Sequence, residues 1–477
     1  MICENFAYPK LMGFFEEISA IPRGSYHEEK ITEYLVSFAN ERGLECYSDS
    51  IGNVLINLPA TEDKKHLPAI LLQGHTDMVC EKNAGVEHDF LNDPLKLYVK
   101  DGWLRAEGTT LGADNGVAVA VMLALLDGAA ESHRALQCLF TVSEEVGLDG
   151  AKAFDYSRIY ARKMINMDSA DEKMIIAGCA GGLRSSVIFP VEREVCEGKY
   201  IKVSIKGLFG GHSGEDIQKG RANANKLMGR ALNRLFAADP TARLVSVNGG
   251  TKENAIPREA EAIIVSGNEG LIYSECEKIS REIYAELVKD DSDFRLAAEE
   301  CISDTLPMTD DCCRKTVFFM LSVANGVFEV NHGLSGVVEF SRNLGIVTTK
   351  EDSVEFVENS RSARESQIDL SAAELDMYAE ILGGKSDHFN RYPGWVYSEN
   401  SEIREEYARA YNELFGGEPE VEVIHAGLEC GIIKQAVPDM DMLSCGPVVV
   451  NLHSPDEALD IASFERFFKV ILNIVTK

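Results

Sequence analysis

Two short histidine-containing segments lie near opposite ends of this 477-residue chain, and they constrain its fold more than any other feature. The first is Gln-Gly-His-Thr-Asp-Met-Val at residues 73–79, and the second is Leu-His-Ser-Pro at residues 452–455. Acidic segments lie between them: Gly-Ala-Asp-Asn-Gly at 112–116, Ser-Glu-Glu at 143–145 and Asn-Met-Asp-Ser at 166–169. If these side chains form one site, the fold must bring the two histidine segments together, and the middle of the chain must be an insertion.

The first third of the chain alternates between helical and extended patterns. Residues 28–42 carry apolar side chains at helical spacing, and Gly43 follows where a helix commonly ends. The stretch 117–126, rich in Ala and Leu, predicts a second helix. Short apolar runs predict strands at 54–58, 69–72, 136–142 and 164–167. This alternation is typical of α/β domains, in which helices cover both faces of a parallel or mixed sheet.

Candidate ligands follow three of these predicted strands: first His75, then Glu144 with Glu145, then Asp168. In open α/β sheets, sites form outside the carboxyl ends of the strands. Because three separate segments obey this rule, we expect their side chains to share one site.

The pattern changes after the Gly-Cys-Ala-Gly-Gly junction at 178–182. Strands are predicted at 200–205, 260–265 and 336–340, and helices at 222–236, 271–288 and 372–382. Gly383-Gly384 marks a second junction, after which helix and strand alternate again. We therefore predict a catalytic domain formed by residues 1–182 and 383–477, interrupted by an inserted α+β lid or dimerisation domain at 183–382.

Composition excludes several kinds of partner. Lys and Arg number 47 against 77 Asp and Glu, which gives a net charge of −30. Nucleic acids and anionic membranes need a basic face, so neither is an expected partner. No apolar run approaches the roughly 18 to 20 residues that span a bilayer, and residues 1–6 lack the pattern of a secretory signal. The twelve cysteines, without a CxxC pair, predict reduced thiols in a cytoplasmic protein; a disulfide framework is the alternative.

The acidic and histidine residues suit a pair of divalent metal ions. Zinc binds nitrogen and oxygen ligands at about 2.0 to 2.2 Å, and two ions about 3.5 to 4 Å apart can share a carboxylate. If one carboxylate bridges, there are ligands enough for two ions: His75, Asp114, Glu145, Asp168 and His453.

Two further carboxylates have roles beside such a centre. Asp77 lies two residues after His75, on the same side of an extended segment, and can fix the imidazole tautomer. Glu144 neighbours Glu145 but points differently, which suits a general base.

Each of these residues also has a simpler explanation when taken alone. A single His is commonly a surface or satisfied residue, and a Glu-Glu pair is commonly solvated. Asp-Asn-Gly at 114–116 is typical of a turn or a helix start, and Asp168 with Ser169 could be an N-cap. Their co-occurrence in an α/β frame favours the metal site.

Longer segments carry a resemblance to a known family. They are GHTDMV at 74–79, GTTLGADNG at 108–116, GHSG at 211–214, NAIPR at 254–258, HAGLECG at 425–431 and HSP at 453–455. On these segments the chain resembles, nearly end to end, the dinuclear-zinc metallopeptidases that include aminoacylases, carboxypeptidases and dipeptidases. The segments at 108–116 and 425–431 are typical of the dipeptidase branch, whereas HxD and Glu-Glu are shared by the wider family.

The resemblance implies a zinc-peptidase-like fold and a division of ligands between two ions. His75 and Asp168 would hold one zinc, Glu145 and His453 the other, and Asp114 would bridge them. Cobalt and manganese suit the same ligands. The resemblance also implies a cis peptide bond between Asp114 and Asn115.

The resemblance further implies the catalytic and substrate-binding roles. Glu144 would take a proton from the metal-bridged water and pass it to the leaving amine, while Asp77 would orient His75. In the inserted domain, His212 would bind substrate or the developing oxyanion, in its own subunit or from a neighbouring one. Asn254 and Arg361 would hold the substrate's carboxylate; the alternative for Arg361 is an ordinary surface residue.

The implied function is metal-dependent hydrolysis of dipeptides with a free amino terminus, Xaa-His dipeptides among them, by a cytoplasmic homodimer. One alternative is an N-acyl amino acid deacylase or a tripeptide aminopeptidase of the same family. Another is a non-catalytic metal-binding homologue, against which the presence of Glu144 beside a full ligand set argues.

Overall fold

The structure is a computed structural model that describes residues 6–331 and 336–477. The chain divides into two compact units. Unit 1 comprises Met1–Cys179, Trp395–Val423 and Leu428–Lys477, and unit 2 comprises Ala180–Gly394 and Ile424–Gly427. Each unit therefore has its own core, and the first is assembled from both ends of the chain.

A mixed sheet forms the centre of unit 1. In spatial order its strands are β1 (Glu45–Ser48), β2 (Val54–Leu58), β6 (Leu136–Thr141), β3 (Ile70–His75), β7 (Lys163–Asn166), β21 (Asp441–Ser444), β8 (Met174–Cys179) and β20 (Glu420–Ile424). The neighbours β6, β3, β7 and β21 run parallel to one another, while β1, β2 and β8 pair antiparallel. The carboxyl ends of the central parallel strands thus lie at one edge of the sheet.

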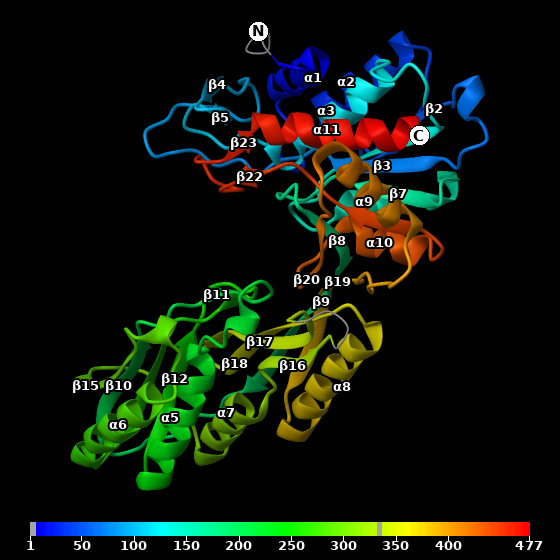
Figure 1. Ribbon diagram of the computed structural model, residues 1–477. Coiled ribbons are helices and arrows are strands. Elements are labelled where there is room, and N and C mark those ends of the chain that lie inside the picture. The colour runs from blue at the N-terminus through cyan, green and yellow to red at the C-terminus, as the bar shows by residue number, and fades with distance from the viewer. Residues whose placement is uncertain (1–5, 332–335) are drawn as a thin grey trace. The chain divides into compact units, whose positions relative to one another are not determined.

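Helices lie on both faces of this sheet, as the α/β pattern predicts. They are α1 (Pro9–Ser19), α2 (Glu29–Glu41), α3 (Ala113–Leu126), α4 (Asp149–Ala153), α9 (Glu402–Phe415), α10 (Glu429–Ala436) and α11 (Ile461–Thr476). Figure 1 shows α11 beside α1 and α3. From the opposite face, α10 reaches the sheet through Glu429, which accepts hydrogen bonds from Gln73 and Thr141.

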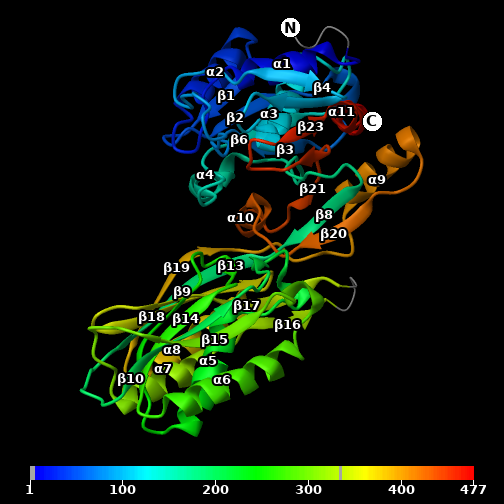
Figure 2. The ribbon, with the colours of Figure 1, turned by 90° about the vertical axis from the view of Figure 1, so that its left-hand side faces the viewer.

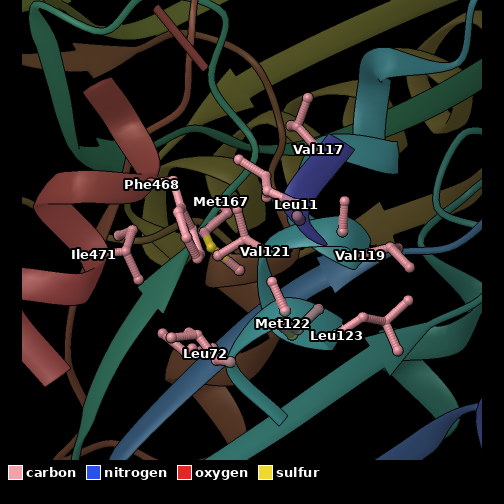
Figure 3. Packing of buried hydrophobic residues seen from close by; sticks show 14 of the residues in the cluster. Leu11, Leu72, Val117, Val119, Val121, Met122, Leu123, Met167, Phe468 and Ile471 are labelled. Atoms are coloured by element: carbon pink, nitrogen blue, oxygen red, sulfur yellow. The ribbon is translucent and has the colours of Figure 1, made fainter. Parts of the chain in front are cut away.

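The central helix α3 is apolar all round because it is enclosed. Its residues 115–126 are all buried, and a helix without a polar face is stable only inside a core. Val121 and Met122 pack with Leu72 of β3 and Phe468 of α11 in one cluster (Figure 3). This packing holds the first turn of α3 beside the end of β3.

A small antiparallel sheet completes unit 1. Its strands are β22 (Val449–Val450), β23 (Ala458–Asp460), β5 (Trp103–Ala106) and β4 (Leu97–Lys100). It joins the segment before α3 to the segment after His453. Among the described residues, no helix is long and apolar enough to cross a membrane.

Unit 2 is an α+β unit built on a second sheet. Its strands follow the order β15 (Arg295–Cys301), β10 (Lys199–Lys206), β14 (Ala260–Ser266), β12 (Arg243–Gly249), β17 (Val338–Thr349), β18 (Ser353–Ser362), β9 (Gly181–Pro190) and β19 (Lys385–Tyr392), with β16 (Gly326–Val330) paired to β17. Its helices are α5 (Ala224–Ala238), α6 (Glu269–Tyr284), α7 (Asp310–Ser322) and α8 (Glu365–Leu382). Figure 2 shows these helices along one side of the sheet, where they share a core with it. A short ribbon pairs β11 (Gly211–His212) with β13 (Ala255–Ile256).

The structure changes the expected domain boundaries. The first junction lies at 179/180 rather than 182/183, and the second at 394/395 rather than 382/383. The second moves because β19 continues the sheet of unit 2 by pairing with β9. A four-residue stretch, Ile424–Gly427, also groups with unit 2.

Candidate active site

The fold of unit 1 carries all five candidate ligands to one place. His75 is the last residue of β3, Glu145 follows β6 and Asp168 follows β7. Because these three strands are parallel neighbours, their carboxyl ends meet. Asp114 lies in the first turn of α3, and His453 follows β22.

Asp114 lies between the two imidazoles. Its Oδ1 is 3.0 Å from His75 Nε2, and its Oδ2 is 3.3 Å from His453 Nε2. On one side, Asp168 Oδ1 is 3.7 Å from His75 Nε2. On the other, Glu145 Oε1 is 3.2 Å from His453 Nε2. The two carboxylate oxygens of Asp114 thus face two separate ligand groups.

Ligand atoms within 4.8 Å of one another define these groups in the described part of the chain. One contains His75, Asp114 and Asp168, and another contains Asp114, Glu145 and His453. A third joins His75 to Glu144 and Glu145. Imidazole nitrogens and carboxylate oxygens are the ligands that zinc and similar ions take, so the donor set fits two ions that share Asp114.

The electrostatics of the site favour bound positive charge. Burial alone would lower the pKa of His75, but hydrogen bonds to Asp114, Asp168 and Asp77 hold that pKa well above its usual value. Hydrogen bonds to Asp114 and Glu145 raise the pKa of His453 to about 10. In the absence of metal, protons on the imidazoles would balance carboxylates that lie too close together to be stable alone.

Asp77 contacts both His75 and the turn that carries Glu144 and Glu145. His75 Nδ1 lies 3.1 Å from the Asp77 carbonyl oxygen and 3.3 Å from its Oδ1. The Asp77 carboxylate also accepts hydrogen bonds from the backbone N–H groups of Glu144 at 3.0 Å and Glu145 at 3.2 Å, and from the Ser25 hydroxyl at 2.8 Å. One buried carboxylate therefore fixes the relative position of two arms of the site.

Glu144 lies beside the candidate ligands, in the group that includes His75 and Glu145. Burial raises the pKa of Glu144 well above its usual value; His75 opposes the shift, and Asp168 and Glu429 add to it. A carboxyl whose pKa is raised by its surroundings can accept and return a proton near neutral pH.

The backbone has unusual conformations at two of the candidate ligands. The Asp114–Asn115 peptide bond is cis, as the resemblance implied, and His453 has φ of 60°. A Cβ atom on Gly74 would lie 2.3 Å from the Ala118 Cβ, so only glycine lets α3 approach β3 this closely. That approach is what brings Asp114 to His75.

Three supporting residues were not predicted. The buried Arg23 guanidinium donates hydrogen bonds to the carbonyls of Thr76 at 2.9 Å and Gly112 at 2.6 Å. Glu28 accepts from the Ser143 backbone N–H at 2.7 Å and its hydroxyl at 2.8 Å, immediately before Glu144. Arg23 and Glu28 lie outside the motifs of the sequence. Their partners are mostly backbone groups, which no sequence pattern marks.

A buried carboxylate, Glu429, is the third of these residues. It lies in the HAGLECG segment and hydrogen-bonds to Gln73 and Thr141. Burial is the main cause that raises its pKa to about 7. The segment itself was the signal that could have identified it.

The three candidate substrate-binding residues all lie in unit 2. His212 in β11 pairs with Ala255 in β13, and the Ser213 N–H donates to the Asn254 carbonyl at 2.9 Å, so His212 and Asn254 share one ribbon. Arg361 in β18 is buried, not a surface residue, and donates to the Tyr392 hydroxyl at 3.0 Å.

The unpredicted His425 belongs to the same neighbourhood of unit 2. Its Nε2 lies 2.7 Å from the hydroxyl of Ser341, which is the register partner of Arg361. Within the described residues, the Arg361 Nε is buried without a hydrogen-bond partner. Burial and the charge of Arg361 lower the pKa of His212, and the same two causes bring the pKa of His425 to about 3. Both imidazoles are thus neutral beside a buried cation.

Comparison with known proteins agrees with this architecture. The chain is 37% identical over 469 residues to the cytosol non-specific dipeptidase of Escherichia coli (strain K12), with 98% of this chain and 96% of that protein covered. The structure matches aminoacylhistidine dipeptidase from Vibrio alginolyticus with a TM-score of 0.92 and 35% identity, covering 99% of this chain and 97% of the other. The aminopeptidase PepT from Bacillus cereus shares the fold, with a TM-score of 0.56, 18% identity, and 98% and 97% coverage.

These similarities confirm the predicted fold and the expected branch of the family. The model of peptidase family M20/M25/M40 matches residues 71–477, which include all five candidate ligands. The chain therefore belongs to peptidase family M20/M25/M40.

Proposed function

We propose that this protein is a metal-dependent dipeptidase that hydrolyses dipeptides with a free amino terminus, including Xaa-His dipeptides. One observation carries the proposal: Asp114 lies between His75 and His453, with Glu145 and Asp168 beside them and Glu144 adjacent. The names of the Escherichia coli and Vibrio alginolyticus relatives, similar over nearly their whole lengths, support the dipeptide as substrate.

Two divalent ions are the proposed cofactor. His75 and Asp168 would hold one ion, Glu145 and His453 the other, and Asp114 both. Zinc is the proposed metal because its ligand preferences match this set, and cobalt or manganese would also be accepted. When bound, the ions supply Lewis-acid polarisation of the scissile carbonyl and lower the pKa of a catalytic water.

The residues of the chain perform the proton transfers and the positioning. Glu144 takes the proton of the attacking water on its carboxylate and returns it to the amine that leaves. Asp77 keeps the His75 ring in place and, through two backbone amides, fixes the turn that carries Glu144. General base and general acid are thus one side chain acting in sequence.

Unit 2 would supply the groups that recognise the substrate. We assign the α-carboxylate of the dipeptide to Arg361 with Asn254, and to His212 the binding of substrate or of the developing oxyanion. The buried Arg361 Nε has no hydrogen-bond partner in the described part of the chain, which leaves a donor for an anion. Neutral His212 offers a hydrogen-bond donor without adding a second charge.

Replacing Arg361 with Ala should raise KM for dipeptides by roughly 10- to 100-fold, since a charge-assisted hydrogen bond contributes about 1.5 to 3 kcal/mol. The kcat at saturation should change less, because Arg361 does not contact the reacting bond. Steady-state kinetics on one dipeptide gives both constants. Arg364→Ala, which removes a half-exposed guanidinium two residues after the same strand ends, is the matched control. An unchanged KM in Arg361→Ala would remove Arg361 from the substrate site.

A substrate panel tests the proposed activity itself. Xaa-His and other dipeptides, a tripeptide, N-acetyl amino acids and an N-acetylated dipeptide would be offered to the metal-loaded protein. We expect the highest kcat/KM on free dipeptides and a large loss when the amino terminus is acetylated. Preference for N-acetyl amino acids would instead identify a deacylase, and preference for the tripeptide an aminopeptidase. Absence of hydrolysis in every case would favour a non-catalytic metal-binding protein.

The oligomeric state and location are further proposals. Unit 2 exposes large apolar side chains on neighbouring elements: Phe318 and Leu321 of α7, Val327, Phe328 and Val330 of β16, and Leu370, Met377 and Ile381 of α8. We propose that a second copy of the chain covers them in a homodimer, because soluble proteins seldom leave such surfaces exposed. A cytoplasmic location is supported by the unpaired cysteines of the described residues and by the name of the Escherichia coli relative.

A further inference from the structure

The single buried carboxylate of Glu457 accepts hydrogen bonds from the backbone at the start of α3. Glu457 is 2% exposed. Its Oε2 accepts hydrogen bonds from the N–H groups of Leu111 at 2.8 Å and Gly112 at 3.0 Å, and its Oε1 from those of Ala113 at 2.8 Å and Asp114 at 3.4 Å. The first N–H groups of a helix have no partner within it, and here a residue more than 340 positions away supplies one.

The other side of Glu457 is fixed to the loop of His453. The Glu457 N–H donates to the Ser454 carbonyl at 3.0 Å, and the Ser454 hydroxyl donates to the Asn451 carbonyl at 2.8 Å. Directly after Glu457, β23 begins and pairs with β5. Since the loop is closed by its own hydrogen bonds and anchored in a sheet, the Glu457 carboxylate and the His453 ring move as one piece.

We propose that Glu457 is a positioning residue that sets the separation between Asp114 and His453, and so forms the binding site for one of the two ions. This inference rests on the proposed dinuclear centre. The ion affected is the one assigned to Asp114, Glu145 and His453. The other ion would also share Asp114, but its two remaining ligands, His75 and Asp168, are positioned through the main sheet by the ends of β3 and β7, so its affinity should fall less.

The charge of Glu457 is needed as well as its shape. A carboxylate offers two acceptor oxygens, which here take four N–H groups. A glutamine of the same size accepts at one oxygen only, and its NH2 group would face two N–H donors. Glu457→Gln should therefore displace the Leu111–Asp114 backbone without leaving a cavity, and Glu457→Asp should keep the charge but shorten the reach.

Metal titration of protein from which a chelator has removed the metal tests the inference. Wild type, Glu457→Gln and Glu457→Asp would be titrated with Co²⁺ and with Zn²⁺, with bound metal measured by equilibrium dialysis and the Co²⁺ environment by visible absorption. We expect two ions per wild-type chain, and in Glu457→Gln one tight ion with the second weakened roughly 10- to 100-fold, as for other residues that support ligands. Glu457→Gln should also lower kcat, and excess metal should partly restore it. The affinity of Glu457→Asp for the second ion, and its kcat, should lie between those of wild type and Glu457→Gln.

A control separates positioning from a general loss of stability. Glu406 in α9 also accepts from two partners in unit 1, Arg134 at 3.1 Å and Lys163 at 2.6 Å, away from the ligands. Glu406→Gln should lower Tm yet leave both metal affinities and the Co²⁺ spectrum unchanged.

Each other outcome has a definite meaning. Two unaltered ions in a folded Glu457→Gln, or equal weakening of both ions, would overturn the role of Glu457 while leaving the metal centre intact. If Glu457→Gln does not fold, Glu457→Asp decides by the same comparison, and unaltered binding there would also overturn it. A wild-type protein that binds fewer than two ions would instead contradict the proposed centre.

Discussion

Glu144→Gln should lower kcat for dipeptide hydrolysis by roughly 10²- to 10⁴-fold, the contribution expected of a positioned general acid–base. The amide cannot take the proton of the attacking water or return it to the leaving amine. Because Glu144 is a neighbour of the ligand set and not one of the five assigned ligands, the variant should still bind two ions. Metal analysis of the dialysed variant, beside its steady-state kinetics, measures both properties.

The exposed Glu41→Gln on α2 is the control for this substitution and should retain wild-type kinetics. Near-normal turnover in Glu144→Gln would show that another group is the base. Loss of an ion together with activity would make Glu144 a ligand instead, a possibility that its place in a group with His75 and Glu145 allows.

Asp114→Asn is expected to have the other large effect, on both ions at once. Asp114 is the only candidate ligand that lies in both the His75–Asp168 and the Glu145–His453 groups, as far as the described residues show. An amide has one acceptor oxygen and no charge, so it cannot serve two cations. Affinity for each ion should fall by more than the roughly 10- to 100-fold that loss of a mere supporting residue costs, and hydrolysis should become undetectable.

Asp168→Asn is the matched comparison, because Asp168 belongs to one group only. Ions that bind the native state raise Tm. Added zinc should therefore raise the Tm of wild type most, of Asp168→Asn less and of Asp114→Asn little. An Asp114→Asn protein that keeps two tightly bound ions would show that Asp114 does not bridge.

The grouping of three candidate ligands could be predicted because each of them follows a local rule. His75, Glu145 and Asp168 each follow a short apolar run, and parallel neighbours place such ends together whatever the rest of the fold does. The place of His453 could not be predicted from such a rule, because its neighbours Asp114 and Glu145 lie more than 300 residues earlier in the sequence. The family resemblance supplied that connection.

The supporting residues could not be predicted because they act on the backbone. Arg23 donates to carbonyl groups and Glu457 accepts from amide groups. Every residue but proline carries the same backbone groups, so no spacing or residue pair in the sequence marks these contacts. Only the folded chain shows that Gly112 lies between the two side chains.

Unit 2 was harder to predict because its strands bury polar side chains. Ser341, Arg342 and Asn343 are all buried in the middle of β17, where an apolar–polar alternation would be expected of a simple strand. The last strand, β19, reads Lys-Ser-Asp-His-Phe-Asn-Arg-Tyr and is largely exposed. The Gly383-Gly384 pair directly before it predicts a domain junction, and the polar sequence of β19 gives no sign that the sheet of unit 2 continues beyond that pair.

Diffraction from crystals of the zinc-loaded protein, with anomalous data collected at the zinc edge, is the decisive test of the dinuclear centre. Two anomalous peaks about 3.5 to 4 Å apart are expected. One should lie against His75 and Asp168, the other against Glu145 and His453, with Asp114 touching both. A single peak, or two peaks that do not share Asp114, would contradict it.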